Sequence, residues 1–343
     1  MKLTYSKKPL REVFGETLVE LGGLHSRLLV LDADLNTSSR TILFKERFPD
    51  RFIQCGIAEA NLFGIAAGLA AQGYVTFPST FAAFAARKAL DQVYVNIAYP
   101  CLDVKIAGSY CGMTATECGP SHNCAEDLAV MRALPHVKVL DPGDNRELRS
   151  MMHVMMATPG PVYFRVSKVN APELFPDGHE FAFGRGHLLR QGRDIALIGT
   201  GFMTAVALGA AELLDREGIS AAVAHMPSLK PIDEDLLGRL ARDTGALVTI
   251  ENHRIYGGLG GAVAEVTARE YPVHVDAMGL GDTVFEAAPL QDLLRHYQLT
   301  PRALAARARA LVERKRKGVA AGSRRRVART VITATTAALP RTP

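Results

Sequence analysis

One acidic residue stands out by its position in the sequence. Glu59 lies near the start of a run of small and apolar residues, GIAEANLFGIAAGL, that directly follows a short β-branched segment. A helix N-terminus stabilises a charged carboxylate, whereas burial stabilises its neutral form. Such a group can hold or share a proton with a ring nitrogen of a ligand. The structural alternative is a capping glutamate, with Gly64 and Gly68 allowing the helix to pack closely.

Aromatic and imidazole side chains follow in the same half of the chain. Phe81 and Phe84 are three residues apart, and such rings can stack on a planar ligand. Their spacing also suits one face of a helix in an ordinary core. His122 lies in the segment ECGPSHNCAEDLA, where an imidazole could relay protons near neutral pH. A loop histidine without a function is the alternative.

Several other chemistries lose support. The turn at 199–204, GTGFMT, lacks the third glycine and the downstream acid of a dinucleotide site. The phosphate-loop, HExxH and GxSxG motifs do not occur. The five cysteines are odd in number and form no CxxC pair, so we expect reduced, mostly buried thiols rather than disulfides or a zinc ribbon. We assign no residue of this chain as a metal ligand.

Alternating strands and helices must position these side chains. We predict strands at 27–34, 51–56, 74–79, 103–109, 137–142, 161–167, 194–201, 221–226, 246–252 and 273–280. We predict helices near 8–22, 58–72, 80–97, 124–133, 144–157, 203–217, 233–243 and 258–270. Nearly continuous apolar strands between helices are typical of a mostly parallel sheet covered on both faces. Ligands of such sheets bind at the carboxyl ends of the strands, which here are followed by the loops at 32–39, 79–84 and 108–122.

The length of 343 residues indicates about two domains. The proline- and glycine-containing stretch 168–190 is typical of a linker, and a second α/β unit follows it. We therefore expect an α/β protein with a larger unit over 1–180, a smaller unit over 181–315 and a basic, flexible tail over 316–343.

Charge is unevenly distributed along the chain. The net charge of +5 arises because residues 301–343 hold twelve Lys or Arg and one acid, Glu313. Without interleaved aromatic residues or a known motif, this tail does not indicate nucleic-acid binding.

No apolar run reaches the roughly 18 residues of a membrane span, and the N-terminus has no signal-peptide core. We expect a cytoplasmic protein that does not bind membranes.

Several motifs in order resemble the transketolase family. Glu59 with Gly64 and Gly68 matches the pyrimidine-domain signature of thiamine-diphosphate enzymes, and FAAF (81–84), GPSH (119–122) and IENHRIYGGLGG (250–261) are similar to later family segments. The resemblance covers about residues 8–315. It implies a pyrimidine-binding domain followed by a transketolase C-terminal domain.

The chain lacks the Gly-Asp-Gly motif with which the family binds the magnesium diphosphate. It therefore resembles the C-terminal half of a split transketolase. The resemblance implies that a separate N-terminal-half subunit supplies the diphosphate site and most of the contacts to Mg²⁺ or Ca²⁺. It also implies an α2β2 assembly that is active only when both chains are present.

The resemblance assigns roles to individual residues. Glu59 would hydrogen-bond a ring nitrogen of the aminopyrimidine and so favour the imino tautomer that activates thiamine diphosphate. Phe81 and Phe84 would contact the pyrimidine, and Asp34 would lie near the thiazolium. His122 would face the substrate hydroxyls. The reaction transfers a two-carbon ketol unit from a ketose phosphate to an aldose.

Binding of a sugar phosphate is implied for three further residues, Arg11, Ser38 and Lys168, the last standing where the family usually has arginine. Two positions depart from the family. Tyr110 replaces a phosphate-binding histidine, and Cys118 replaces an aspartate that binds a substrate hydroxyl. We therefore expect a non-standard sugar substrate, such as an unusual ketose phosphate or a sulfonated or branched sugar.

Other functions remain open at this point. The beta subunit of a 2-oxo acid dehydrogenase complex shares the two-domain layout, but the phosphate-binding trio and the GPSH loop argue against it. 1-Deoxyxylulose-phosphate synthase is also similar, but is normally one long chain. A non-catalytic regulatory homologue is the third alternative, and the presence of Glu59, Phe84 and His122 argues against it.

Overall fold

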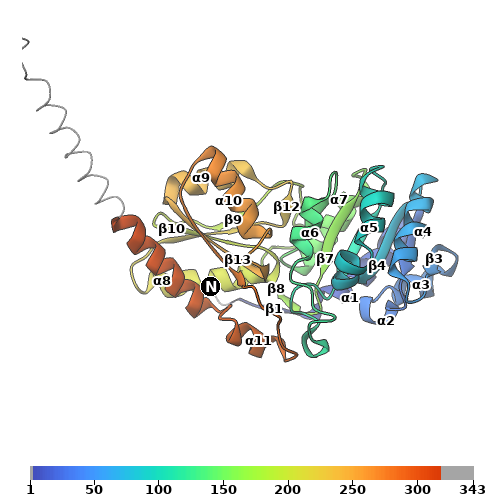
Figure 1. Cartoon of the computed structure of the whole chain (residues 1–343), viewed down its shortest axis with the longest axis horizontal. Coiled ribbons are helices and arrows are strands. Elements are labelled where there is room, and N and C mark those ends of the chain that lie inside the picture. Colours follow the sequence, from blue (N-terminus) through green and yellow to red (C-terminus); the bar gives the residue numbers. More distant parts are fainter. Residues whose placement is uncertain (1–2, 318–343) are drawn as a thin grey trace, which may run out of the picture.

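A computed structural model describes residues 3–317 and shows two α/β units side by side (Figure 1). The larger unit has a seven-stranded sheet and the smaller a five-stranded sheet, which confirms the predicted fold class. Most of the predicted tail, residues 318–343, lies outside the described residues. Residues 316 and 317 continue a helix that begins at 301.

The larger sheet has the strand order β12-β6-β7-β5-β4-β2-β3. All neighbouring strands are parallel except β12, which pairs antiparallel with β6. The strands are β2 (Leu28–Asp32), β3 (Phe52–Gln54), β4 (Val75–Phe81), β5 (Lys105–Ser109), β6 (Lys138–Leu140), β7 (Val162–Val166) and β12 (Ser228–Lys230). Apolar runs such as LLVLD are buried along their whole length, because helices cover both faces of this sheet.

Helices form a layer on each face of the larger sheet. One layer contains α1 (Leu10–Leu24), α3 (Ile42–Arg47) and α7 (Asn145–Met156), which bury Leu10, Phe14, Phe44 and Met151 in one core. The opposite layer contains α4 (Glu59–Ala71) and α6 (Asp127–Ala133). The short helix α2 (Asn36–Ser39) and a 3-10 turn, η1 (Pro49–Arg51), complete the connections between β2 and β3.

The prediction of one regular helix near 80–97 is wrong. Strand β4 continues through Phe81, and the rest forms η2 (Phe84–Lys88), α5 (Leu90–Gln92) and η3 (Val93–Ala98), of which η2 and η3 are π-helical. The apolar residues of 80–97 include many alanines, so their spacing does not distinguish π-helical turns from α-helical turns. π-Turns are frequent at functional sites.

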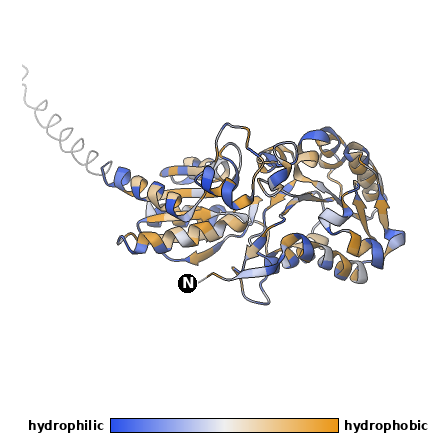
Figure 2. Ribbon diagram, turned by 90° about the horizontal axis from the view of Figure 1, so that it is seen from below, coloured by the Kyte–Doolittle hydropathy of each residue, from blue (hydrophilic) through white to orange (hydrophobic). Residues whose placement is uncertain are grey.

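The smaller sheet has the order β14-β13-β10-β11-β9, with β9 antiparallel at one edge. Its strands are β9 (His187–Arg190), β10 (Ile195–Gly199), β11 (Ala221–His225), β13 (Ala246–Arg254) and β14 (His274–Leu280). Helices α9 (Glu234–Thr244) and α10 (Leu259–Glu270) cover one face. The 3-10 turn η5 (Gly201–Met203), α8 (Thr204–Asp215), α11 (Leu290–His296) and the helix at 301–317 pack on the other. Figure 2 shows apolar strands inside this layered arrangement.

The stretch predicted as a linker, 168–190, is more ordered than expected. It contains β8 (Asn170–Pro172), which pairs antiparallel with β1 (Tyr5–Pro9), and β9 of the smaller sheet. Both strands of the β1–β8 pair are short and contain proline, so their sequences carry little strand signal.

Buried polar groups join the two units. The Arg165 guanidinium on β7 donates to both carboxylate oxygens of Asp127, at 2.8 and 2.5 Å. Arg165 also donates to the main-chain oxygen of Asn252 on β13, at 3.2 Å. Because Arg165 is only 1% exposed, this bidentate pairing is what makes its burial tolerable.

Across residues 3–317, none of the helices is both long and apolar enough to cross a membrane.

All five cysteines are free, but only Cys111 and Cys124 are fully buried. The expectation that most of the thiols are buried is therefore wrong, since Cys101 and Cys118 lie exposed in loops.

Candidate functional site

An aromatic cluster lies at the carboxyl ends of β4 and β5. The Phe81 ring stacks on Tyr110 with 4.4 Å between centroids and on Phe84 with 5.7 Å. His122 meets the Phe81 and Phe84 rings edge-on, at 5.9 and 5.4 Å. These four predicted site residues come from three separate segments, and the parallel sheet brings them to one edge as expected.

Glu59 lies beside this cluster as the first residue of α4. Its side chain is 1% exposed. Its Oε2 atom forms an ion pair with the Lys88 ammonium. Lys88 Nζ also lies 5.8 Å from the centroid of the Phe84 ring. The half-exposed Lys88 ammonium thus lies where a hydrogen-bond donor from a ligand would contact this buried oxygen.

Lys88 is not among the predicted site residues. It is the last residue of the π-helical turn η2 and lies 29 positions from Glu59 in the sequence. No spacing rule connects two residues so far apart, so only the tertiary structure reveals the pair.

The predicted phosphate-binding residues also meet around Tyr110. Arg11 Nη1 donates to the Tyr110 hydroxyl at 2.6 Å and to the Ser38 main-chain oxygen at 3.2 Å. Lys168 Nζ lies 5.6 Å from the Tyr110 ring centroid. Arg11 Nε is buried without a hydrogen-bond partner among the described residues. Two cations and an unused N–H donor at one place favour an anionic ligand.

A buried amide holds the loop that carries His122 and Cys118. The Asn252 side chain accepts a hydrogen bond from Met113 N at 3.1 Å and donates to Cys111 O at 3.4 Å. Asn252 belongs to the smaller unit, so that unit shapes the loop. At the loop tip, Cys118 is exposed, and His122 Nδ1 lies 2.8 Å from Ser121 Oγ.

Asp34 lies at the same sheet edge, and the next residue, Leu35, packs against Phe81 and Tyr110. It is exposed and has a positive φ of 64°, and within residues 3–317 we find no hydrogen bond or ion pair to its carboxylate. The neighbouring Asp32 is buried and organises this loop by accepting hydrogen bonds from Ser39 Oγ at 3.0 Å and Thr41 Oγ1 at 2.8 Å. Burial raises the pKa of Asp32. Asp32 is not among the predicted site residues, because two acids at one strand end look alike in the sequence.

The geometry combines three chemical capacities. A buried carboxylate can exchange a hydrogen bond with a ring nitrogen, and the adjacent Phe84 offers a flat apolar surface. An imidazole beside these rings can transfer protons. Arg11 and Lys168 can bind an anionic group. A planar nitrogen heterocycle together with an anionic polyol would match all three.

Two family models match nearly the whole described chain. Residues 6–173 match the pyrimidine-binding domain of transketolase, and residues 184–304 match the transketolase C-terminal domain.

Several relatives are similar over almost their full length. The chain is 39% identical to the 6-deoxy-6-sulfo-D-fructose transketolase subunit SqwH of Clostridium sp. (strain MSTE9), covering 89% of this chain and 95% of that protein. It is 34% identical to an apulose-4-phosphate transketolase subunit of Phocaeicola vulgatus, covering 84% and 93%. A solved structure described as a split gene transketolase, inactive beta4 tetramer, is 45% identical with a TM-score of 0.84, covering 89% and 99%.

Proposed function

This chain belongs to the transketolase family, and from that membership we propose that it is the C-terminal-half subunit of a split transketolase. The observation that carries the proposal is the buried Glu59 carboxylate, which lies near the Phe84 ring and contacts the half-exposed Lys88 ammonium. Family membership supports a transferase role, with transfer of a two-carbon ketol unit from a ketose donor to an aldose acceptor.

The residues present fit the aminopyrimidine of thiamine diphosphate. When bound, thiamine diphosphate would supply a carbon nucleophile for the donor's carbonyl and an acceptor for the electron pair of the broken C–C bond. Glu59 offers a carboxylate to a ring nitrogen, and Phe84 offers a face for stacking with Phe81 behind it. Asp34 stays a proposed contact to the thiazolium side.

The remaining site residues bind and orient the substrate in this proposal. His122 faces the substrate hydroxyls and takes up or returns their protons. Arg11, Ser38 and Lys168 bind the anionic end of the sugar. Arg11 would then contact both this anionic group and the Tyr110 hydroxyl. Cys118, in the exposed loop, occupies the position of the family aspartate that binds a substrate hydroxyl.

A non-standard sugar is the proposed donor. Tyr110 and Cys118 stand in place of the imidazole and the carboxylate of common transketolases. A site that leaves a substrate hydroxyl without a hydrogen bond selects against that substrate. Similarity to subunits named for sulfofructose and for apulose phosphate supports this choice. Such substrates retain an anionic group for Arg11 and Lys168.

A second, different chain completes the proposed enzyme. It would bind the diphosphate together with Mg²⁺ or Ca²⁺ and form an α2β2 assembly. Four large apolar side chains near Glu59 and η3 are exposed, and exposed apolar surface supports such an interface. They are Ile57 just before Glu59, and Tyr94, Val95 and Tyr99 on and after η3, which packs on α4. In this proposal the pyrimidine domain spans 1–180 and the C-terminal domain 181–315.

A ketol-transfer assay tests the proposal. The full chain is assayed alone and mixed with a candidate N-terminal-half subunit, in the presence of thiamine diphosphate and Mg²⁺. The donor panel includes xylulose 5-phosphate, 6-deoxy-6-sulfofructose and apulose 4-phosphate. We expect activity in the mixture alone, lost on Glu59→Ala but retained in Glu16→Ala, a surface control.

The outcomes separate the parts of the proposal. Full activity of the isolated chain would contradict the need for a partner. Equal kinetics on xylulose 5-phosphate and on every rarer donor would contradict the substrate assignment. A verified complex that is inactive on the whole panel would contradict the transketolase activity.

A further inference from the structure

A second cluster of titratable side chains lies away from the aromatic site. Glu147 in the first turn of α7 faces His179, in the loop before β9, and His187, the first residue of β9. Its Oε1 atom lies 3.6 Å from His179 Nε2 and 3.6 Å from His187 Nε2. The three ligand-type atoms all lie within 4.8 Å of one another.

These three atoms are buried, and none has a hydrogen-bond partner among residues 3–317. The other oxygen of Glu147 is fully occupied. Oε2 accepts from Gly143 N at 2.7 Å and contacts His225 Nε2 at 2.8 Å. One carboxylate oxygen is thus satisfied twice, while its neighbour faces two unpaired imidazole nitrogens. Three converging, unpartnered polar atoms indicate a ligand that accepts all three lone pairs.

We propose that Glu147, His179 and His187 bind one divalent transition-metal ion, with Zn²⁺ the best chemical match. Zn²⁺ bonds to histidine nitrogen and carboxylate oxygen are about 2.0–2.2 Å long, which places neighbouring ligand atoms of a tetrahedral site about 3.3 Å apart. The observed 3.6 Å separations need only a small contraction. Two imidazoles and one carboxylate leave a fourth position for water.

The surrounding groups are those of a metal site. His225 contacts Glu147 through Nε2 and Thr204 Oγ1 through Nδ1, at 2.6 Å. This chain of contacts fixes the carboxylate orientation, as the outer hydrogen bonds of metal ligands do. The Phe175 ring stacks on His179 with 3.9 Å between centroids and meets His187 edge-on at 4.9 Å. Phe175 thus supplies an apolar cover.

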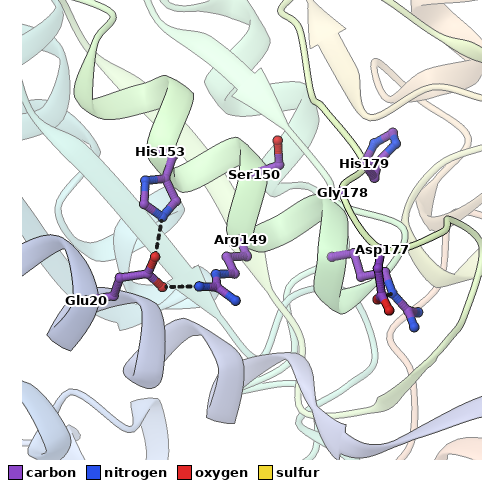
Figure 3. A pocket seen from close by; sticks show the side chains of 8 residues that line it. Glu20, Arg149, Ser150, His153, Asp177, Gly178 and His179 are labelled. Atoms are coloured by element: carbon purple, nitrogen blue, oxygen red, sulfur yellow. Dashed lines mark hydrogen bonds and ion pairs between the residues drawn. The ribbon is translucent and has the colours of Figure 1, made fainter.

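One proposed ligand, His179, also lines a surface cavity of about 510 Å³. Figure 3 shows His179 on one side of the cavity and the Glu20 ion pairs with Arg149 and His153 on the other. The ligands come from α7 of the larger unit and from β9 and the loop before it, and His225 is on β11. Bound metal would therefore join the two units, although the sequence contains neither a CxxC nor an HExxH pattern.

Metal uptake by the full chain tests the proposal directly. Protein stripped with EDTA is titrated with Zn²⁺ against a chromophoric chelator, and Co²⁺ is added separately to record its visible absorption. We expect one Zn²⁺ per chain, tetrahedral Co²⁺ bands and a higher melting temperature with metal. His187→Ala and His179→Asn should abolish tight binding, and His225→Gln should weaken it by about 10- to 100-fold.

His153→Ala is the matched control, because His153 lines the cavity without facing Glu147 Oε1. It should bind Zn²⁺ like the unaltered chain. Absence of stoichiometric uptake by the unaltered chain would overturn the proposal even if a variant failed to fold. Unchanged binding in folded His187→Ala and His179→Asn would also overturn it, because the ion would then sit elsewhere.

Discussion

The Lys88 ammonium forms an ion pair with the Glu59 carboxylate, although Lys88 has 51% of its side chain exposed and Glu59 has 1%. Lys88 Nζ lies over the Phe84 ring as well. The same two groups, the carboxylate and the ring, are the proposed contacts of the cofactor's pyrimidine. Lys88 and the pyrimidine therefore compete for one place.

Lys88→Met should tighten binding of thiamine diphosphate to the assembled enzyme. The substitution keeps an apolar chain of similar length but removes the charge that must leave Glu59. Calorimetric titration of the complex with thiamine diphosphate would measure the affinity. Lys45→Met is a matched control, because Lys45 lies 5.7 Å from the Phe52 ring centroid, away from the site. Weaker binding in Lys88→Met alone would show that Lys88 supports the cofactor instead.

Arg11→Ala should raise KM for anionic donors more than it lowers kcat. A hydrogen bond to a charged group contributes about 1.5–3 kcal/mol, which corresponds to about a ten- to hundredfold change. Arg27→Ala is the control, because it removes an arginine that lies over Tyr74, with 4.9 Å to the ring centroid, and it should have no such effect. Steady-state kinetics with phosphorylated and unphosphorylated donors would decide. An equal loss on both donors would argue against an anion-binding role.

Asn252→Ala should destabilise the fold and slow the reaction. The change leaves the buried Met113 N–H without its acceptor, which costs about 1–3 kcal/mol. It also frees the loop that positions His122. Urea unfolding would measure the first effect and kcat the second, with Asn170→Ala at an exposed position of β8 as the control. If Asn252→Ala were destabilised but had an unchanged kcat, Asn252 would stabilise the fold without positioning His122 for the reaction.

Glu251 and His253 are buried neighbours on β13 with opposite pKa shifts. Burial raises the pKa of Glu251 from 4.5 to about 7, so Glu251 takes up a proton on folding in that range. Its contribution to the free energy of unfolding falls as pH rises through this window. Burial lowers the pKa of His253 from 6.5 to about 4. Its contribution therefore rises with pH through its own window.

Single substitutions should separate these two contributions. His253→Gln leaves the Glu251 contribution, so its stability should fall more steeply with pH than that of the unaltered chain. Glu251→Gln leaves the His253 contribution and should shift the slope the other way. Urea unfolding measured between pH 4.5 and 6.5, where both windows overlap, gives the slopes. Parallel slopes in the two variants would contradict the opposed shifts.

The sequence predicted best what depends on local apolar runs and on motif order. The strands of the two sheet interiors were found because runs such as LLVLD are buried on both faces. The short strands β1, β8, β9 and β12 were missed, since their pairing is set by distant segments rather than by their own residues. The family motif predicts Glu59 and Phe84. The position of Lys88 beside Glu59 depends on the π-helical turn η2, and the Glu147 cluster forms only where α7 meets β9 and the loop before it, so neither can be predicted from the sequence.

Strand β12 has a practical consequence for dissecting the molecule. It comes from the C-terminal half of the sequence, yet it pairs with β6 and forms the edge of the larger sheet. A truncated chain ending near residue 180 would lack that strand and expose the backbone of β6. Open sheet edges recruit other strands and promote aggregation. The two units are thus separable as sequence blocks but not as independently expressible fragments.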